Sequence, residues 1–335
     1  MPVFLDLNTA LALAQGALDG GNVRAAMEFY DAALIQFPDN PDVLEAYAEV
    51  LVHYSGQPDR AKQLLRHAIE LAPNEGHLKY VNLAQLHEGA EAMSMYEQAL
   101  RVLRHDLAHT RPRNEREALK RQISSVRCAM AELFLTDLCD LDEAEDECEK
   151  AVAEALELWS DNVEAHHLKA SLRISQERND EALESLRVAV RTLKTLGEED
   201  MPTYETQVEL GKLLMQTSPR DAFPYLLDVL QLNDTNAYVW FLLGETARMR
   251  QKYNDSARLL RRARILVSST NTEALRDIDQ AIRVLVSEMG EEAVSRVPHM
   301  DEPNPIDFLE DDDDDESGDD DDDSGDGDGD VPVDS

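Results

Sequence analysis

The strongest constraint on the fold of this chain is the stretch from Asn236 to Ser268, which reads as two helices joined by a short turn. Large and small side chains recur in it at helical spacing, namely Trp240, Leu243, Gly244, Ala247, Ser256, Leu260 and Ala263. Residues three and four positions apart share one face of a helix, and small residues allow two helix backbones to approach closely. The stretch therefore predicts a pair of packed antiparallel helices.

Six further copies of this pattern can be placed along the chain. The first two end at Pro38 and Pro73, 35 residues apart. The third copy is four residues, about one helical turn, short between Ala84 and Ala92. Each helix pair can bury its apolar face only against its neighbours, so seven copies predict an all-α solenoid.

The predicted solenoid spans residues 1–297. It contains a basic insertion near 104–123, since the segment 101–127 has eight Arg or Lys and three acids, and we expect a connecting loop there followed by a lengthened helix. An apolar stripe predicts a capping helix near 271–289, formed by Leu275, Ile278, Ile282, Leu285 and Met289. Residues 298–335, rich in Asp, Gly and Ser, predict a disordered acidic tail, because this composition cannot bury a core.

The excess of acidic residues in the chain favours some classes of binding partner over others. The chain has 69 Asp and Glu against 32 Lys and Arg, and residues 301–335 hold 19 of the acids with no Lys or Arg. Direct binding to nucleic acid is disfavoured, since phosphate contacts need a surplus of basic residues. A basic protein partner is favoured instead. No segment has the apolar length of a signal peptide or a membrane span, so we expect no membrane partner and a soluble intracellular protein.

The sequence has no convincing motif for catalysis or metal binding. The sequence has no P-loop, HExxH or GxSxG motif, which predicts a protein that is not an enzyme and has no cofactor. His105 and His109 have a metal-ligand spacing without further ligands nearby. Asp326, Asp328 and Asp330 imitate a calcium loop, but Val331 stands where glycine is required. We therefore expect no specific metal site.

The repeat resembles the tetratricopeptide repeat, in which the first helices of successive hairpins line the inner face of a right-handed superhelix. The resemblance implies that repeat positions 5, 6 and 9 point inward. The residues there form a predicted groove for a basic, partly apolar peptide: Glu45, Glu49, Gln85, Glu132, Glu209, Phe241 and Glu245. The alternative is that these glutamates are ordinary solvated side chains.

A wider resemblance rests on the segments 79–103, 131–156 and 170–183 and on the Asp-rich end. Together they resemble dedicated assembly chaperones of the fourth large-subunit ribosomal protein. The resemblance implies a chaperone that captures this newly made basic protein, shields its basic and apolar loop, and accompanies it from cytoplasm to nucleus for pre-60S assembly. Nuclear import receptors would be further partners.

Two other functions remain open from sequence. One is a chaperone of histones or of basic proteins in general, and the other is a scaffold in a multi-subunit complex. The tail likewise has three interpretations: a solubilising segment, a mimic of nucleic-acid charge that covers a basic partner, or a segment that folds back on 101–127 or on 248–264.

Overall fold

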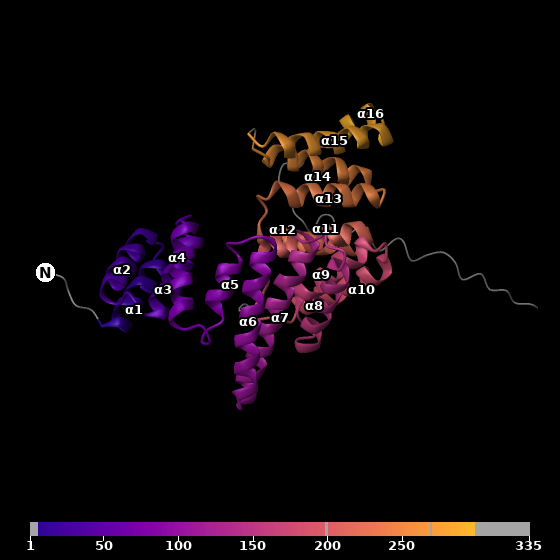
Figure 1. The fold of residues 1–335 in the computed structure, drawn as a ribbon. Helices are drawn as coiled ribbons and strands as arrows, with labels where there is room; N and C mark the ends of the chain where they lie inside the picture. The colour runs from indigo at the N-terminus through magenta and orange to yellow at the C-terminus, as the bar shows by residue number, and fades with distance from the viewer. Residues whose placement is uncertain (1–5, 198–199, 269, 299–335) are drawn as a thin grey trace, which may run out of the picture. The chain divides into compact units, whose positions relative to one another are not determined.

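The computed structural model describes residues 6–197, 200–268 and 270–298, and this part of the chain is α-helical without β-strands (Figure 1). Eleven helices precede residue 218: α1 Leu7–Asp19, α2 Val23–Gln36, α3 Pro41–His53, α4 Pro58–Leu71, α5 Leu78–Ala84, α6 Gly89–His109, α7 Arg113–Leu135, α8 Ala144–Leu158, α9 Val163–Ser175, α10 Asn179–Leu193 and α11 Tyr204–Thr217. Five follow it: α12 Pro219–Leu232, α13 Ala237–Met249, α14 Tyr253–Leu266, α15 Thr272–Met289 and α16 Glu291–Arg296. The predicted all-α array of helix hairpins is confirmed.

The chain divides into two compact units, one up to Thr217 and one from Ser218. The predicted single solenoid over 1–297 does not include this division and stays a prediction. The predicted acidic tail, apart from Pro298, lies outside the described residues. Within the described part of the chain, no helix has the length and apolar character needed to cross a membrane.

Helix starts follow local capping chemistry. Asn40 precedes Pro41, the first residue of α3, and its side-chain oxygen accepts a hydrogen bond from the backbone N–H of Val43 at 3.1 Å. Asn side chains satisfy backbone donors that a helix start leaves unpaired, and proline suits the first helical position. Asn236 caps α13 in the same way, accepting from the N–H of Tyr238 at 2.9 Å.

In the first unit, consecutive helices pack as hairpins, α1 with α2, α3 with α4, α5 with α6, α7 with α8 and α9 with α10. Ala14 and Ala26 are fully buried where α1 and α2 meet. The rings of Tyr30 and Tyr47 stack with centroids 5.3 Å apart and join the first hairpin to the second. Alternating small and aromatic side chains thus fill the space between helices, as the repeat pattern predicts.

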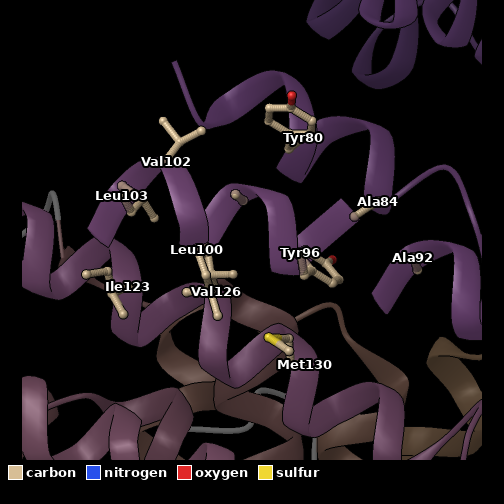
Figure 2. Close-up of a cluster of buried hydrophobic side chains, with 11 residues drawn as sticks. Tyr80, Ala84, Ala92, Tyr96, Leu100, Val102, Leu103, Ile123, Val126 and Met130 are labelled. Carbon is tan, nitrogen blue, oxygen red and sulfur yellow. The ribbon is translucent and has the colours of Figure 1, made fainter. Parts of the chain in front are cut away.

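The third and fourth hairpins depart from a regular repeat. α5 has only 7 residues, which accounts for the missing turn. α6 and α7 have 21 and 23 residues, and only residues 110–112 separate them. Their shared core includes Tyr80, Tyr96 and Met130 (Figure 2).

The basic insertion contains the expected connection and lengthened helix, α7, but the connection is confined to residues 110–112, because the insertion also extends α6 to His109. The side chain of Arg116 explains the tight turn, because its guanidinium donates to the carbonyl oxygens of Leu107 and Thr110. These carbonyls lie at the end of α6 and just after it, where they lack helical partners.

In the second unit, α13 and α14 pack so closely that a Cβ atom added to Gly244 would lie 2.7 Å from the side chain of Leu260. Trp240 is buried, and its indole N–H donates to the carbonyl oxygen of Asp234 at 2.7 Å. α15 packs on α14 with Ile278 and Leu285 buried.

The capping helix has a short partner that the sequence interpretation missed. α16 packs on α15, and Val294 is buried between them. The guanidinium of Arg261 on α14 donates to the carbonyl oxygens of Val294 and Val297. A six-residue helix has too little sequence to show a periodic pattern, so this element depends on tertiary contacts.

Candidate functional site

The first helices of successive hairpins contact one another in the first unit: α3 contacts α5, α7 contacts α9, and α9 contacts α11. We call the surface formed by α3, α5, α7, α9 and α11 the first-helix face. The predicted groove residues Glu45, Glu49, Glu132 and Glu209 lie on these helices, and Gln85 directly follows α5. Phe241 and Glu245 lie on α13 in the second unit and are described apart from them.

Glu45 is engaged within the protein. Its Oε1 lies 3.3 Å from Nζ of Lys79, a side chain that is only 1% exposed. The same ammonium group donates to the carbonyl oxygen of Glu75. Burial raises the pKa of Glu45, while the charge of Lys79 opposes this shift. Glu45 therefore balances a buried cation between α3 and α5, which leaves it poorly suited to bind a ligand.

Two other predicted carboxylates are also paired. Glu209 lies 2.9 Å from Lys212. Glu245 lies 2.9 Å from Arg248, which also approaches Glu288 at 3.2 Å.

Phe241 is half-buried against the core of the second unit and stacks on Tyr238, with ring centroids 6.1 Å apart. By contrast, Glu49, Gln85 and Glu132 are exposed. Among the described residues, no ion pair involves Glu49 or Glu132. The structure therefore divides the predicted groove residues into paired and available ones.

The first-helix face also holds a cavity of about 420 Å³ that the sequence interpretation missed. We call it the Glu164 pocket. Its lining residues come from α5 and the residue before it, α7, the residue after α8, the start of α9 and the segment before α11: His77, Leu78, Val81, Arg121, Gln122, Ser125, Val126, Trp159, Asn162, Val163, Glu164, Asp200, Met201 and Pro202. Leu78 and Met201 are 54% and 39% exposed, so the pocket offers apolar surface to a ligand.

Local sequence places Glu164 at the pocket. Asn162 caps α9, and its side-chain oxygen accepts the N–H groups of Glu164 and Ala165 at 3.0 and 3.2 Å. Its amide nitrogen donates to the hydroxyl oxygen of Ser124 on α7 at 2.8 Å. Asn162 is itself buried. Because a buried polar group needs hydrogen-bond partners, Asn162 holds the start of α9 against α7.

The carboxylate of Glu164 stands out electrostatically. Burial, and then the negative charge of Glu132, raise the pKa of Glu164 to about 7. In the described part of the chain, no cation or hydrogen-bond donor pairs with this carboxylate. The cation that shares the pocket is already engaged: Arg121 lies 2.7 Å from Asp200 and 5.0 Å above the ring of Trp159. The pocket thus combines apolar walls with one uncompensated acid.

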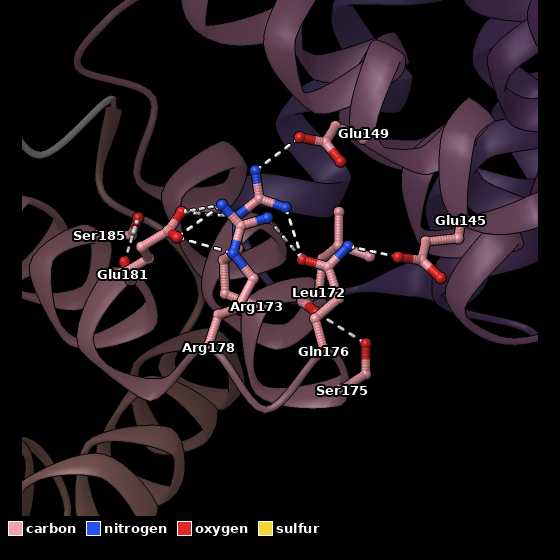
Figure 3. A network of polar contacts seen from close by, with 9 residues as sticks. All are labelled: Glu145, Glu149, Leu172, Arg173, Ser175, Gln176, Arg178, Glu181 and Ser185. Atoms are coloured by element: carbon pink, nitrogen blue, oxygen red, sulfur yellow. Dashed lines mark hydrogen bonds and ion pairs between the residues drawn. The ribbon is translucent and has the colours of Figure 1, made fainter.

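At the other end of α9, a buried charged side chain is paired with charged side chains of the neighbouring helices. Figure 3 shows Arg173 of α9 between Glu149 of α8 and Glu181 of α10. The guanidinium lies 2.6 Å from Glu149 and 3.2 Å from Glu181, and it also donates to Gln176 at 2.7 Å. We call these residues the Arg173 junction. It joins three helices and is a structural feature.

The sequence interpretation missed Glu164, although its position relative to the repeat could have identified it. The inward positions assumed for the repeat place His167 on the face, and Glu164 lies three residues earlier, one turn along the same side of α9. Extending the inward set by one turn toward the helix start would have included it. Trp159, Leu78 and Met201 lie at or beyond helix ends, where repeat periodicity predicts nothing.

Comparisons with known proteins agree with this architecture. A tetratricopeptide-repeat family model matches residues 12–86. The sequence is 32% identical over 205 residues to the Schizosaccharomyces pombe protein named probable assembly chaperone of rpl4, covering 60% of each chain. It is 28% identical over 251 residues to the Emericella nidulans protein of the same name, covering 71% of this chain and 62% of that one. This chain therefore spans less than two thirds of the length of either relative.

A solved structure shows the same fold. The structure of the assembly chaperone of RpL4 (Acl4) aligns with a TM-score of 0.64 at 24% identity, covering 76% of this chain and 100% of that one. The chain therefore has an all-α fold of the tetratricopeptide-repeat type, and its resemblance to the assembly chaperones of Rpl4, predicted from its sequence, is confirmed.

Proposed function

We propose that this protein is a dedicated chaperone that binds a newly made, highly basic ribosomal protein of the large subunit, the fourth, and keeps it soluble until pre-60S assembly. The observation that carries the proposal is the uncompensated carboxylate of Glu164 in an apolar pocket, with the exposed Glu132 near enough to raise its pKa. The names of the two sequence relatives support the choice of client. A function in binding of this kind requires neither a catalytic group nor a cofactor.

The physical mechanism is competition for basic side chains. A ribosomal protein segment rich in Arg and Lys binds RNA nonspecifically, because phosphate contacts depend mainly on charge. An acidic surface occupies these side chains and releases them where ribosomal RNA offers more contacts. The acidic balance of the chain, 69 acids against 32 bases, also repels nucleic acid from the chaperone itself.

The same proposal predicts where the protein works. A client made in the cytoplasm and assembled in the nucleus requires a chaperone present in both compartments. Nuclear import receptors are then expected partners of the chaperone–client complex.

A tagged pull-down from cells, washed at moderate salt and quantified by mass spectrometry, tests the function. We expect one large-subunit ribosomal protein at about equal stoichiometry, without the remaining ribosomal proteins. Histones at equal or greater yield would support a general basic-protein chaperone instead. A constant set of many non-ribosomal subunits would support a scaffold.

A further inference from the structure

We propose that the Glu164 pocket holds a single lysine or arginine side chain of an extended basic segment, with the aliphatic stem against the apolar wall and the cation at Glu164. This inference rests on the proposed function for its choice of a basic ligand. The sequence predicts only an acidic groove, whereas the pocket provides one defined binding position for a basic side chain.

The dimensions of the pocket suit such an anchor. Its volume of about 420 Å³ falls within the range of about 300–1,000 Å³ that is typical of ligand sites. This is more than one side chain occupies, so the backbone and part of a neighbouring residue would enter as well. The pocket is lined by residues of α5, α7 and α9, three helices of the first-helix face.

The walls match the two parts of a basic side chain. Lysine and arginine pack their methylene groups on apolar surface while they keep the charged end near polar groups. Leu78 and Val81 of α5, together with Met201, supply apolar surface to the pocket. These side chains remain partly or largely exposed, so the protein alone does not cover them.

The charges around the pocket favour a cation. Arg121 and Asp200 form an ion pair at 2.7 Å and largely cancel each other. Burial lowers the pKa of His77, partly opposed by Asp106, so the imidazole is mainly neutral at pH 7. Glu132 of α7 adds a negative charge.

Two further groups sense the charge of Glu164. Burial raises the pKa of Tyr96 on α6 to about 12, and burial raises that of Cys128 on α7 well above its ordinary value, with Glu164 and Glu132 contributing to both shifts. Both side chains are therefore neutral at pH 7. Apart from the Arg121–Asp200 ion pair, the charges named around the pocket are those of Glu164, Glu132 and Asp106, and all three are negative.

Binding a cation there would release a proton. At pH 7 about half of the Glu164 side chains carry a proton, because the pKa is about 7. A bound ammonium or guanidinium group favours the ionised carboxylate, so the ligand binds this form more tightly. Affinity should rise with pH up to about 7, by at most about tenfold per pH unit, and then level off.

The experiment is isothermal titration calorimetry of the full chain with purified Rpl4 between pH 6 and pH 8, in buffers of different ionisation enthalpy. The wild type should release close to one proton at pH 6 and little at pH 8. In the variant Glu164→Gln the affinity at pH 8 should fall at least about tenfold, and the pH-dependent proton release should disappear.

Two variants keep the result interpretable. Glu157→Gln removes the same charge from an exposed residue outside the pocket and should bind like the wild type. Glu132→Gln removes a charge that raises the pKa of Glu164, so it should move the pH dependence to lower pH without abolishing it.

The outcomes separate the two proposals. Wild-type affinity and proton release in Glu164→Gln, with its folding verified by circular dichroism, would overturn the pocket assignment and leave the chaperone function standing. Failure of the wild type to bind Rpl4 would overturn the proposed function and this inference with it. Where the wild type binds, single Lys or Arg residues of the bound segment can be replaced by norleucine. The replacement that abolishes proton release identifies the anchor and shows whether it is a lysine or an arginine.

Discussion

The two ends of α9 carry opposite charges and differ in how those charges are compensated. In the last turn, Arg173 has two carboxylates within 3.2 Å. In the first turn, Glu164 has no cation among the described residues, and its pKa rises to about 7. An unpaired, partly buried charge costs stability. Its presence therefore supports the proposed contact with a ligand, whereas the Arg173 junction is explained by the fold alone.

The same contrast occurs on α3, where Glu45 pairs with buried Lys79 and Glu49 is exposed. Both residues were predicted to contact a client. Charged residue type and repeat position cannot separate them, because the difference depends on which side chain of the next repeat lies opposite. Substitutions that exchange or remove charge should therefore separate structural acids from available ones.

The largest effect is expected at Glu45. The substitution Glu45→Lys would place a second cation beside Lys79, which is 1% exposed, and leave both uncompensated. We expect the free energy of unfolding to fall by about 3–5 kcal/mol, measured by urea denaturation followed by circular dichroism. Glu49→Lys, one turn later on α3, is the matched control and should change stability by less than about 0.5 kcal/mol. Equal effects of the two substitutions would remove the distinction between paired and available acids.

A smaller loss is expected at the Arg173 junction. Arg173→Met keeps the aliphatic stem and removes the charge, and we expect a loss of about 2–3 kcal/mol in the free energy of unfolding. The expected loss is smaller than that for Glu45→Lys because Glu149 and Glu181 are about half exposed, at 47% and 48%, and can regain water. Arg178→Met is the control, since Arg178 is 46% exposed and its ion pair is with Glu181; it should cost less than about 1 kcal/mol. A similar loss in both variants would contradict a special role for Arg173.

At Glu164, removal of the charge should increase the free energy of unfolding, unlike the two substitutions above. The folded-state pKa of about 7 lies above the ordinary value of 4.5, so the contribution of Glu164 to stability is greatest below pH 4.5 and is lost as pH rises to about 7. Glu164→Gln removes this loss and should raise the free energy of unfolding at pH 8 by about 1–2 kcal/mol, after allowance for solvent screening.

Thermal unfolding of both proteins at pH 4.5, 6 and 8 would measure this effect. The two stability curves should converge toward pH 4.5 and separate between there and pH 7. A variant that is less stable than the wild type at pH 8 would show that Glu164 has a structural partner.

The smallest effect on affinity is expected from the acidic tail. Deleting residues 310–335 removes a dense run of acids but no residue of the Glu164 pocket. Client affinity at physiological salt should change less than about threefold, because interactions between solvent-exposed charges are largely screened beyond about 8 Å. Client solubility at low salt should fall more clearly, as turbidity would report. A larger loss of affinity than that of Glu164→Gln would place the main binding energy in the tail.

Sequence periodicity predicted the helix hairpins well because each hairpin is a local unit. The spacing of Trp240, Gly244 and Leu260 follows from how two adjacent helices pack, and the structure has the predicted close contact there. The length of the connection in the basic insertion could not be predicted in this way. The sequence indicated a connecting loop, but its restriction to residues 110–112 depends on Arg116, whose hydrogen bonds to Leu107 and Thr110 sequence spacing does not reveal.

The amino-acid sequence by itself determined the all-α repeat architecture, the acidic balance and the likeness to chaperones of a basic ribosomal protein. These depend on composition and on contacts between residues close in the chain. Only the tertiary structure decided which acids are available. Glu45 is neutralised by a lysine 34 residues away, and Glu164 shares its pocket with residues from 77 to 202. Whether a carboxylate is paired depends on its burial and on neighbours distant in the chain. A local sequence pattern shows neither of these.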